Sequence, residues 1–343
     1  MNKTLPPTES AEAANPASRQ ALRISIVVPV YQGELTLADF LAEIAPLTVE
    51  HATPAGNRWV ICEVLLVHDC GPDRSAEVIE RLAEQHAWVR PVWLSRNFGQ
   101  HPATLAGMAG ALGDWVATLD EDRQHDPRDI DRMLDLALSE RQQLVYAHPR
   151  NTPPHGWLRN AASRLAKTIA SRLIGAATTG RFSSFRLVSG EAARSLAAYC
   201  GSGVYLDVAL RWVVARVGFC QVDLREGVRR PSGYSLSRLL SHFSILVMTA
   251  GARPLRLIAL LGLTSIGLAL LIALWAIYAK LTGQVPVQGW TSLMIVIVFF
   301  SGCILLALGV IAEYLALTLS IAMGKPLYVV TTTPTRNRER ERP

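Results

Sequence analysis

Short apolar runs alternate with stretches of helical spacing in the N-terminal part of the chain. The nearly continuous apolar runs predict strands at 24–30, 62–67, 92–94 and 115–119. Apolar residues three or four positions apart predict helices at 36–44, 75–86, 102–112 and 130–138. Because strands and helices alternate at the spacing of βαβ units, the pattern predicts an α/β domain. Its sheet should be mostly parallel, with helices on both faces.

The pattern is weaker in the next part of the chain. It predicts helices at 158–174, 190–198 and 207–217 and a short strand at 182–188. In the segment 236–249, apolar residues recur at helical spacing with Arg238 and His242 among them. Such a helix is typical of one that lies in the interface plane of a membrane, and we assign 236–254 to it.

Two long apolar runs follow, at 257–279 and at 293–312, and neither contains a charged residue. The second run extends in apolar character to about residue 322. About 20 helical residues cross the ~30 Å hydrocarbon core of a bilayer, so two transmembrane helices are predicted within 255–322. A pair of buried core helices is the alternative, but no soluble segment is left to cover them. The remaining divisions are a disordered segment at 1–22, a catalytic domain at 23–235 and a basic tail at 323–343.

The chain is basic, with a formal net charge of +6. Many of its arginines flank the apolar runs, namely Arg229, Arg230, Arg238, Arg253 and Arg256 before them and Arg336, Arg338, Arg340 and Arg342 after them. This placement favours attraction to anionic lipid headgroups over nucleic-acid binding, for which aromatic residues would be interleaved with the bases. Because positive flanks remain on the cytoplasmic side, both termini and the catalytic domain should be cytoplasmic.

The cysteines and the N-terminus agree with a cytoplasmic catalytic domain. The chain has five cysteines, an odd number at wide spacing without a CxxC pair, which indicates neither a disulfide framework nor a zinc site. The N-terminal segment is polar and lacks the apolar core of a signal peptide.

Polar clusters follow the predicted strands at 32–34, 69–73, 96–101 and 120–126. Since ligands bind at the carboxyl ends of strands in such sheets, these clusters should converge on one edge. Asp120 and Asp122 come directly after a strand, where residues two apart point the same way. Two such carboxylates can hold one hard cation that binds diphosphate oxygens; a solvated acidic turn is the alternative.

Other candidate residues have weaker local signals. Pro29 and Tyr31 would offer backbone groups and a ring beside a base, and Asp69 would hydrogen-bond the base or ribose. Asp69 before Gly-Pro is equally typical of a turn, and the donor-rich loop that contains Arg96 is equally typical of a polar loop. Asp207 at the start of a predicted helix is a candidate base, or an acid favoured there by the helix dipole.

With these motifs the chain resembles family 2 glycosyltransferases of GT-A fold, in the polyprenyl-phosphate branch. Dolichol-phosphate mannose synthases and bacterial undecaprenyl-phosphate sugar transferases belong to that branch. The resemblance covers 24–330 and rests on Val28-Pro29-Val30-Tyr31, Val67-His68-Asp69, Arg96-Asn97-Phe98-Gly99-Gln100-His101, Asp120-Glu121-Asp122-Arg123-Gln124, Ser184-Phe185-Arg186-Leu187, Ser232-Gly233-Tyr234-Ser235, Glu313-Tyr314 and Pro326-Leu327-Tyr328.

The resemblance implies Mg²⁺ or Mn²⁺ at Asp120 and Asp122 and a nucleotide near Pro29, Tyr31, Asp69 and Arg96. It implies a lipid phosphate near Arg229, Arg230, Arg238, Ser232 and Tyr234. The expected reaction is inverting transfer of a sugar from a nucleotide-diphosphate sugar to undecaprenyl phosphate. It would take place at the cytoplasmic face of a bacterial inner membrane, in a multi-pass protein. Uridine is favoured over guanosine by family frequency, and a homo-oligomer is plausible.

The chain departs from the family pattern at several positions. Gln32-Gly33 replaces the common Asn-Glu, Arg123 replaces a Leu, and Gly180 or Arg181 replaces an acid. Arg230 and Pro231 stand where Gly and Lys are usual. Two alternatives remain open, a processive polysaccharide synthase and a non-catalytic membrane scaffold. The chain lacks the Gln-x-x-Arg-Trp pattern of the first, and its intact acidic pair argues against the second.

Overall fold

The computed structural model describes residues 20–150, 182–201, 205–225 and 289–334, together with scattered residues between 262 and 282. The predicted helix at 158–174, the predicted interfacial helix at 236–254 and the disordered segment predicted at 1–22 therefore lie outside the described residues, except for the last residues of that segment. Most of the first predicted membrane span is likewise outside them.

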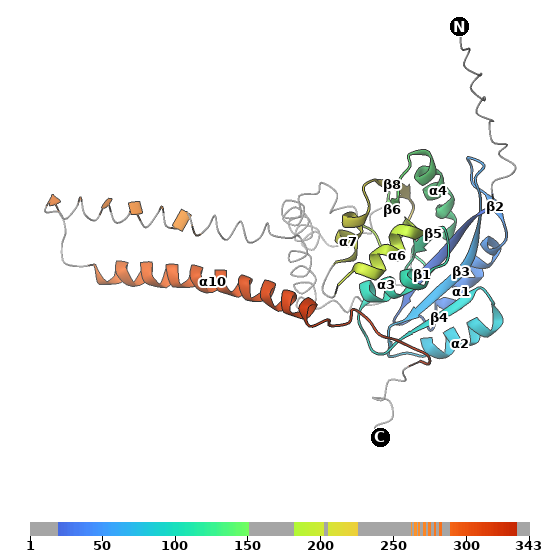
Figure 1. Cartoon of the computed structure of the whole chain (residues 1–343), viewed down its shortest axis with the longest axis horizontal. Coiled ribbons are helices and arrows are strands. Elements are labelled where there is room, and N and C mark those ends of the chain that lie inside the picture. Colours follow the sequence, from blue (N-terminus) through green and yellow to red (C-terminus); the bar gives the residue numbers. More distant parts are fainter. Residues whose placement is uncertain are drawn as a thin grey trace, which may run out of the picture.

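In the described part of the chain, nine strands form one sheet at the centre of the domain, in the order β8-β6-β7-β5-β1-β3-β4-β9 with β2 paired to β3 (Figure 1). Its strands are β1 (Leu22–Val30), β2 (His51–Ala52), β3 (Arg58–His68), β4 (Val89–Leu94), β5 (Trp115–Thr118), β6 (Leu144–Pro149), β7 (Arg186–Ser189), β8 (Val217–Val222) and β9 (Val330–Thr331). The pairs β1–β3, β1–β5, β3–β4 and β6–β8 are parallel. β7 is antiparallel to both of its neighbours, so the prediction of a mostly parallel sheet is confirmed with one reversed central strand.

Helices cover both faces of this sheet, as the alternating pattern predicts (Figure 1). They are α1 (Leu37–Ile44), α2 (Ser75–Gln85), α3 (Gln100–Gly110), α4 (Ile130–Ser139), α6 (Gly190–Tyr199) and α7 (Leu206–Val213), with 3₁₀ turns η2 (Ala45–Thr48) and η3 (Pro127–Asp129). The helix predicted at 207–217 is too long, because the chain is extended at Val214 and Val217 already belongs to β8.

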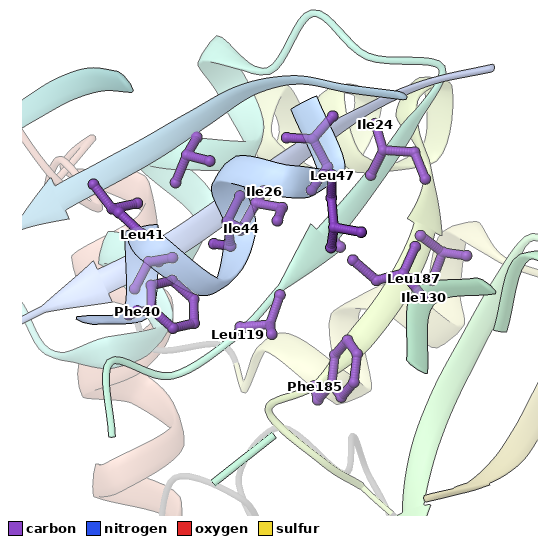
Figure 2. Packing of buried hydrophobic residues seen from close by; sticks show 14 of the residues in the cluster. Ile24, Ile26, Phe40, Leu41, Ile44, Leu47, Leu119, Ile130, Phe185 and Leu187 are labelled. Atoms are coloured by element: carbon purple, nitrogen blue, oxygen red, sulfur yellow. The ribbon is translucent and has the colours of Figure 1, made fainter. Parts of the chain in front are cut away.

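The apolar run of β1 is nearly continuous because both of its faces are buried. Ile24, Ile26 and Val28 belong to one core cluster, with the apolar side chains of α1, α2 and α4 (Figure 2). Val27 belongs to a second cluster on the other face, with the side chains of α3, α6 and α7. Alternate residues of a strand point to opposite faces, so β1 forms part of both cores.

α3 packs very closely on the sheet because its side chains are small. A Cβ atom at Gly107 would lie 2.3 Å from Cγ1 of Val27, which leaves no room for any side chain. The helix begins at Gln100, so this close packing brings its N-terminal residues to the carboxyl edge of the sheet.

The long helix α10 (Trp290–Ala322) projects away from the sheet, and its C-terminal end is the one nearer to the domain (Figure 1). Its part Phe299–Ala322 has a mean hydropathy of 2.2 and is long enough to cross a membrane, and none of it is buried within the described structure. Among the described residues it is the one helix that meets these criteria, so the second predicted span is found as a helix and a pair of spans is not established. The loop predicted at 280–292 is shorter, because α10 already begins at Trp290.

The chain returns to the catalytic domain after α10. β9 pairs antiparallel with the end of β4, and the amide of Ser95 donates to the carbonyl of Val329 at 2.9 Å. Leu327 and Tyr328 pack against the second core cluster. The sequence assigns 323–343 to a basic tail, whereas Val330 and Thr331 within it form an edge strand of the sheet. The segment Tyr328-Val329-Val330-Thr331 consists of aromatic and β-branched residues, which favour strands.

Candidate active site

The loops after β1, β3, β4 and β5 contact one another at the carboxyl edge of the sheet. The Glu121 carboxylate after β5 accepts hydrogen bonds from the backbone amides of Tyr31 (3.1 Å) and Gln32 (3.0 Å). The side-chain amide of Gln100, which begins α3, donates to Oδ1 of Asp120 at 2.6 Å. The polar clusters therefore converge as the sequence predicts.

Asp120 lies at the centre of this edge. Burial raises the pKa of its carboxyl; a hydrogen bond from Ser184 opposes the rise, and the neighbouring negative charge of Asp122 adds to it. Two carboxylates that repel each other and are both half-buried are a favourable place for a cation. Asp122 is also held by the turn, since its Oδ1 accepts from the backbone amide of Gln124 at 3.1 Å.

The donor set fits Mg²⁺ or Mn²⁺ better than a metal that needs an all-protein cage. The described residues contain no group of three or more His, Cys, Asp and Glu that could hold a metal ion. Mg²⁺, however, is usually bound by one or two carboxylates together with water and substrate phosphates. Asp120 and Asp122 match that requirement, and the remaining ligands would come from a diphosphate.

Glu121 is a residue of the candidate site to which the sequence reasoning gave no role. It lies between the two candidate metal ligands, and its carboxylate contacts the loop after β1 instead of the metal position. A Cβ atom at Gly33 would lie 2.8 Å from Oε2 of Glu121, so a glycine suits that position. Glu121 and Asp122 form a turn after β5, so no strand alternation marks this contact in the sequence, and it depends on the packing of the two loops.

The Asp69 side chain is hydrogen-bonded to the loop that contains Arg96. Its two carboxylate oxygens accept from the backbone amides of Phe98 (2.7 Å) and Gly99 (2.8 Å). Burial raises the pKa of Asp69 to about 6, against these hydrogen bonds. The Arg96 guanidinium stacks over the Phe98 ring, 4.2 Å from its centre. Each carboxylate oxygen has a second lone pair, with which it can accept a further hydrogen bond. A contact between Asp69 and a nucleotide is therefore compatible with the two backbone hydrogen bonds, and it stays a prediction.

Tyr31 lies at the end of β1, with 41% of its surface exposed. Its backbone touches the next loop, because a Cβ atom at Gly71 would lie 1.6 Å from the Tyr31 carbonyl oxygen. Only glycine allows this approach of two loops. Pro29 lies two residues earlier in β1, opposite Val67 of β3. The tyrosine ring is therefore available to stack on a planar ligand, which remains untested.

The contacts of Asp207 favour the structural alternative over its role as a base. Asp207 is 2% exposed, and its Oδ1 accepts from the Tyr146 hydroxyl at 2.9 Å. The same oxygen lies 2.7 Å from Nη1 of Arg186, which is also buried. Burial raises the pKa of Asp207, and the charge of Arg186 opposes that rise. A carboxylate paired in this way is poorly placed to reach an acceptor.

The residues predicted to contact the lipid phosphate lie outside the described residues, namely Arg229, Arg230, Ser232, Tyr234 and Arg238. The same holds for Gly180 and Arg181. The nearest described residue is Arg225, which contacts the turn that follows β5: its amide donates to the Gln124 carbonyl at 2.9 Å.

Known proteins resemble this chain over most of its length. An undecaprenyl-phosphate 4-deoxy-4-formamido-L-arabinose transferase of Pseudomonas aeruginosa is 30% identical over 90% of this chain and 89% of its own. A protein of the same name from Edwardsiella ictaluri is 26% identical over 90% and 93%. Among solved structures, glucosyl-3-phosphoglycerate synthase of Mycobacterium tuberculosis with Mn²⁺, UDP and product is 18% identical. It covers 72% of this chain and 86% of its own, with a TM-score of 0.47.

A family model agrees with these relatives. The model described as glycosyl transferase family 2 matches residues 25–196, which include most of β1, all of β3, β4 and β5, and the turn that carries Asp120 and Asp122. The α/β architecture with its mostly parallel sheet is GT-A-like. The chain belongs to glycosyl transferase family 2, and it is a glycosyltransferase.

Proposed function

We propose that this glycosyltransferase moves one sugar from a nucleotide-diphosphate sugar to polyprenyl phosphate at the cytoplasmic face of a bacterial inner membrane. The observation that carries the proposal is the match, over about nine-tenths of the chain, to relatives named as undecaprenyl-phosphate sugar transferases. The apolar helix α10, joined directly to the catalytic sheet through β9, supports an acceptor that resides in the bilayer. The lipid-linked sugar would then serve as a donor for cell-surface glycans or lipids.

The chain's own residues supply binding and orientation. Asp120 and Asp122 would hold Mg²⁺ or Mn²⁺, whose charge would offset that of the diphosphate leaving group. The exposed Tyr31 ring would lie against the base, uridine being expected, with Asp69 and Arg96 beside the nucleotide. Glu121 keeps the loop after β1 against the metal-binding turn.

The acceptor phosphate needs little activation because it is ionised near neutral pH. One of its oxygens would attack the anomeric carbon as the bond to the diphosphate oxygen breaks, and the nucleoside diphosphate would leave with that electron pair. In-line attack inverts the anomeric centre. A protein base is then unnecessary, which agrees with the buried ion pair that Asp207 forms.

The reaction is tested by a donor screen with purified protein, Mg²⁺ and a panel of nucleotide-sugars. Release of nucleoside diphosphate should depend on added undecaprenyl phosphate for one donor. Release that is insensitive to the lipid for every donor would contradict the proposed acceptor.

Arg230 is proposed to hold the lipid phosphate. Arginine binds phosphate through two parallel N–H donors, which lysine cannot reproduce. Since hydrogen bonds to charged groups are worth about 1.5–3 kcal/mol, Arg230→Lys should raise the KM for undecaprenyl phosphate about tenfold or more and leave nucleotide binding unchanged. A variant with lysine at all three positions, Arg229, Arg230 and Arg238, tests the alternative. Normal acceptor kinetics in that variant would indicate that the arginines act only through their positive charge near the membrane surface, worth about 1 kcal/mol per residue.

The membrane topology gives a separate prediction. The arginine-rich flanks place both termini and the catalytic domain in the cytoplasm, so the segment before α10 should be periplasmic. A cysteine introduced at Gln288, with the native cysteines replaced, should react with a membrane-impermeant thiol reagent in intact cells. Labelling only after lysis would reverse the proposed orientation.

A further inference from the structure

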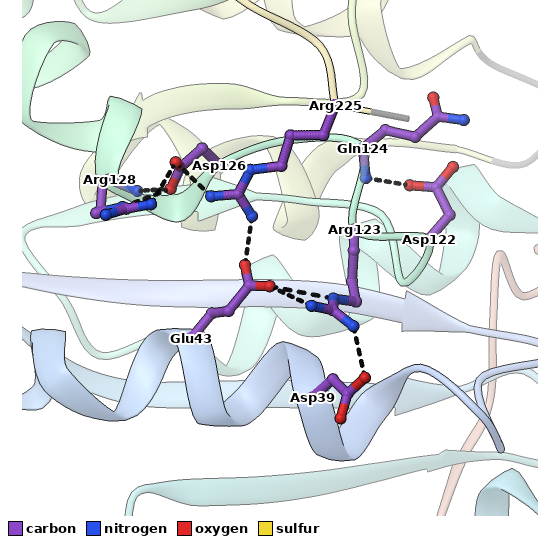
Figure 3. Close-up of polar contacts among 8 residues, drawn as sticks. All are labelled: Asp39, Glu43, Asp122, Arg123, Gln124, Asp126, Arg128 and Arg225. Carbon is purple, nitrogen blue, oxygen red and sulfur yellow. Dashed lines mark hydrogen bonds and ion pairs between the residues drawn. The ribbon is translucent and has the colours of Figure 1, made fainter. Parts of the chain in front are cut away.

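The turn that carries the proposed metal ligands contains a strained residue. Arg123, directly after Asp122, has a φ of 63°, in the left-handed region that non-glycine residues rarely adopt. Its guanidinium donates to Oδ2 of Asp39 at 2.6 Å and, through Nε (3.2 Å) and Nη2, to Oε1 of Glu43 (Figure 3). Both acceptors lie on α1, so the side chain of Arg123 ties this strained turn to a packed helix.

The second oxygen of Glu43 binds another arginine. Nη1 of Arg225 donates to Oε2 of Glu43 at 2.6 Å, and Nη2 of Arg225 forms an ion pair with Asp126 (Figure 3). Because the amide of Arg225 also donates to the Gln124 carbonyl, Arg225 holds the same turn from its other side. The Glu43 carboxylate therefore joins three segments that are far apart in the sequence: α1, the turn after β5, and the residues that directly follow β8, which include Arg225.

Glu43 is suited to this position by its burial and its charge. A quarter of its side chain is exposed, against about a third for each arginine, so the pairs are only partly screened by solvent. Burial acts to raise the pKa of Glu43, but the hydrogen bonds from Arg123 and Arg225 outweigh it and the net pKa is lowered. Glu43 is therefore charged at neutral pH.

We propose that Glu43 is a positioning residue, which through its ion pairs with Arg123 and Arg225 holds the turn of Asp120 and Asp122 in its metal-binding shape. The inference rests on the proposed function, in which that turn binds the metal and, through it, the donor. It also accounts for Arg123, where the family commonly has Leu, because a leucine could not make these ion pairs.

The first test needs neither metal nor donor. Hydrogen–deuterium exchange of full-length protein in detergent should be compared for the wild type, Glu43→Gln and the control Glu50→Gln. Glu50 pairs with Arg58 in an exposed ion pair of the same domain, away from the site. Since hydrogen bonds to charged groups are lost, Glu43→Gln should speed exchange of the amides at 119–126 about tenfold. The control should exchange as the wild type does there, and both variants should melt within a few degrees of it.

The second test measures binding and coupling. The dissociation constants of UDP and GDP with Mn²⁺ should rise about tenfold in Glu43→Gln and in Arg225→Gln, and the double variant should be no weaker than either, because one network is lost in each case. Unchanged exchange at 119–126 in Glu43→Gln, or additive losses of affinity, would refute the positioning role. If the wild type binds neither nucleotide, the proposed function fails, whereas the exchange experiment still decides the role of Glu43.

Discussion

Asp122→Asn should reduce sugar transfer by at least about 10²–10³-fold, the usual cost of removing one charge-stabilising group from an active site. The variant should also lose metal-dependent nucleotide binding in calorimetry, and Asp120→Asn should behave in the same way. The fold should be retained, because the negative charge of Asp122 helps to raise the pKa of the half-buried Asp120, and removal of that charge relieves the repulsion. In the absence of metal, the melting temperature should therefore not fall.

A matched control lies at the opposite end of the same strand. Asp114 precedes β5 and accepts from the backbone amide of Arg23 at 2.8 Å. Asp114→Asn should leave nucleotide binding and turnover close to those of the wild type. Normal turnover in both Asp120→Asn and Asp122→Asn would remove the metal assignment.

Arg186→Met should lower the free energy of unfolding by about 3–5 kcal/mol, because it leaves the buried Asp207 carboxylate without its cation. Chemical denaturation in detergent measures this loss. Arg58→Met, which breaks the exposed ion pair with Glu50, should leave the free energy of unfolding nearly unchanged. Replacing both buried partners, in Arg186→Met with Asp207→Leu, should restore part of the stability.

The same pair separates the two roles of Asp207. If it is structural, Asp207→Asn should weaken stability and activity together, and activity should be recovered at low temperature. A variant that is as stable as the wild type but inactive at every temperature would restore Asp207 as a base.

Much of the fold could be predicted because burial on two faces leaves a clear pattern. β1 and β5 are nearly continuous apolar runs, β3 becomes one from Val64 to Val67, and the acidic pair closely follows β5. β6 and β8 were missed. Their apolar residues occupy runs too short to distinguish a strand from a helix. These segments adopt the strand conformation because each pairs with the other, over six residue pairs between β6 and β8.

The contacts of the site were less predictable than its residues. Asp120 and Asp122 are visible as a local motif, but Glu43 and Arg225 are separated by 182 positions and share no local pattern. Their meeting depends on how α1 and the segment after β8 pack at the edge of the sheet. Likewise, Asp69 could be named as a candidate, whereas its two hydrogen bonds to the loop after β4 require the folded chain.

The central claim is transfer of a single sugar to a polyprenyl phosphate, and the mass of the intact lipid product tests it most directly. Purified protein, Mg²⁺, undecaprenyl phosphate and the active nucleotide-sugar should yield a lipid heavier by one glycosyl residue, with one nucleoside diphosphate released per lipid. Asp122→Asn should give no such product. Lipid that carries a ladder of added sugars would instead indicate a processive synthase, and unmodified lipid with every donor would contradict the account.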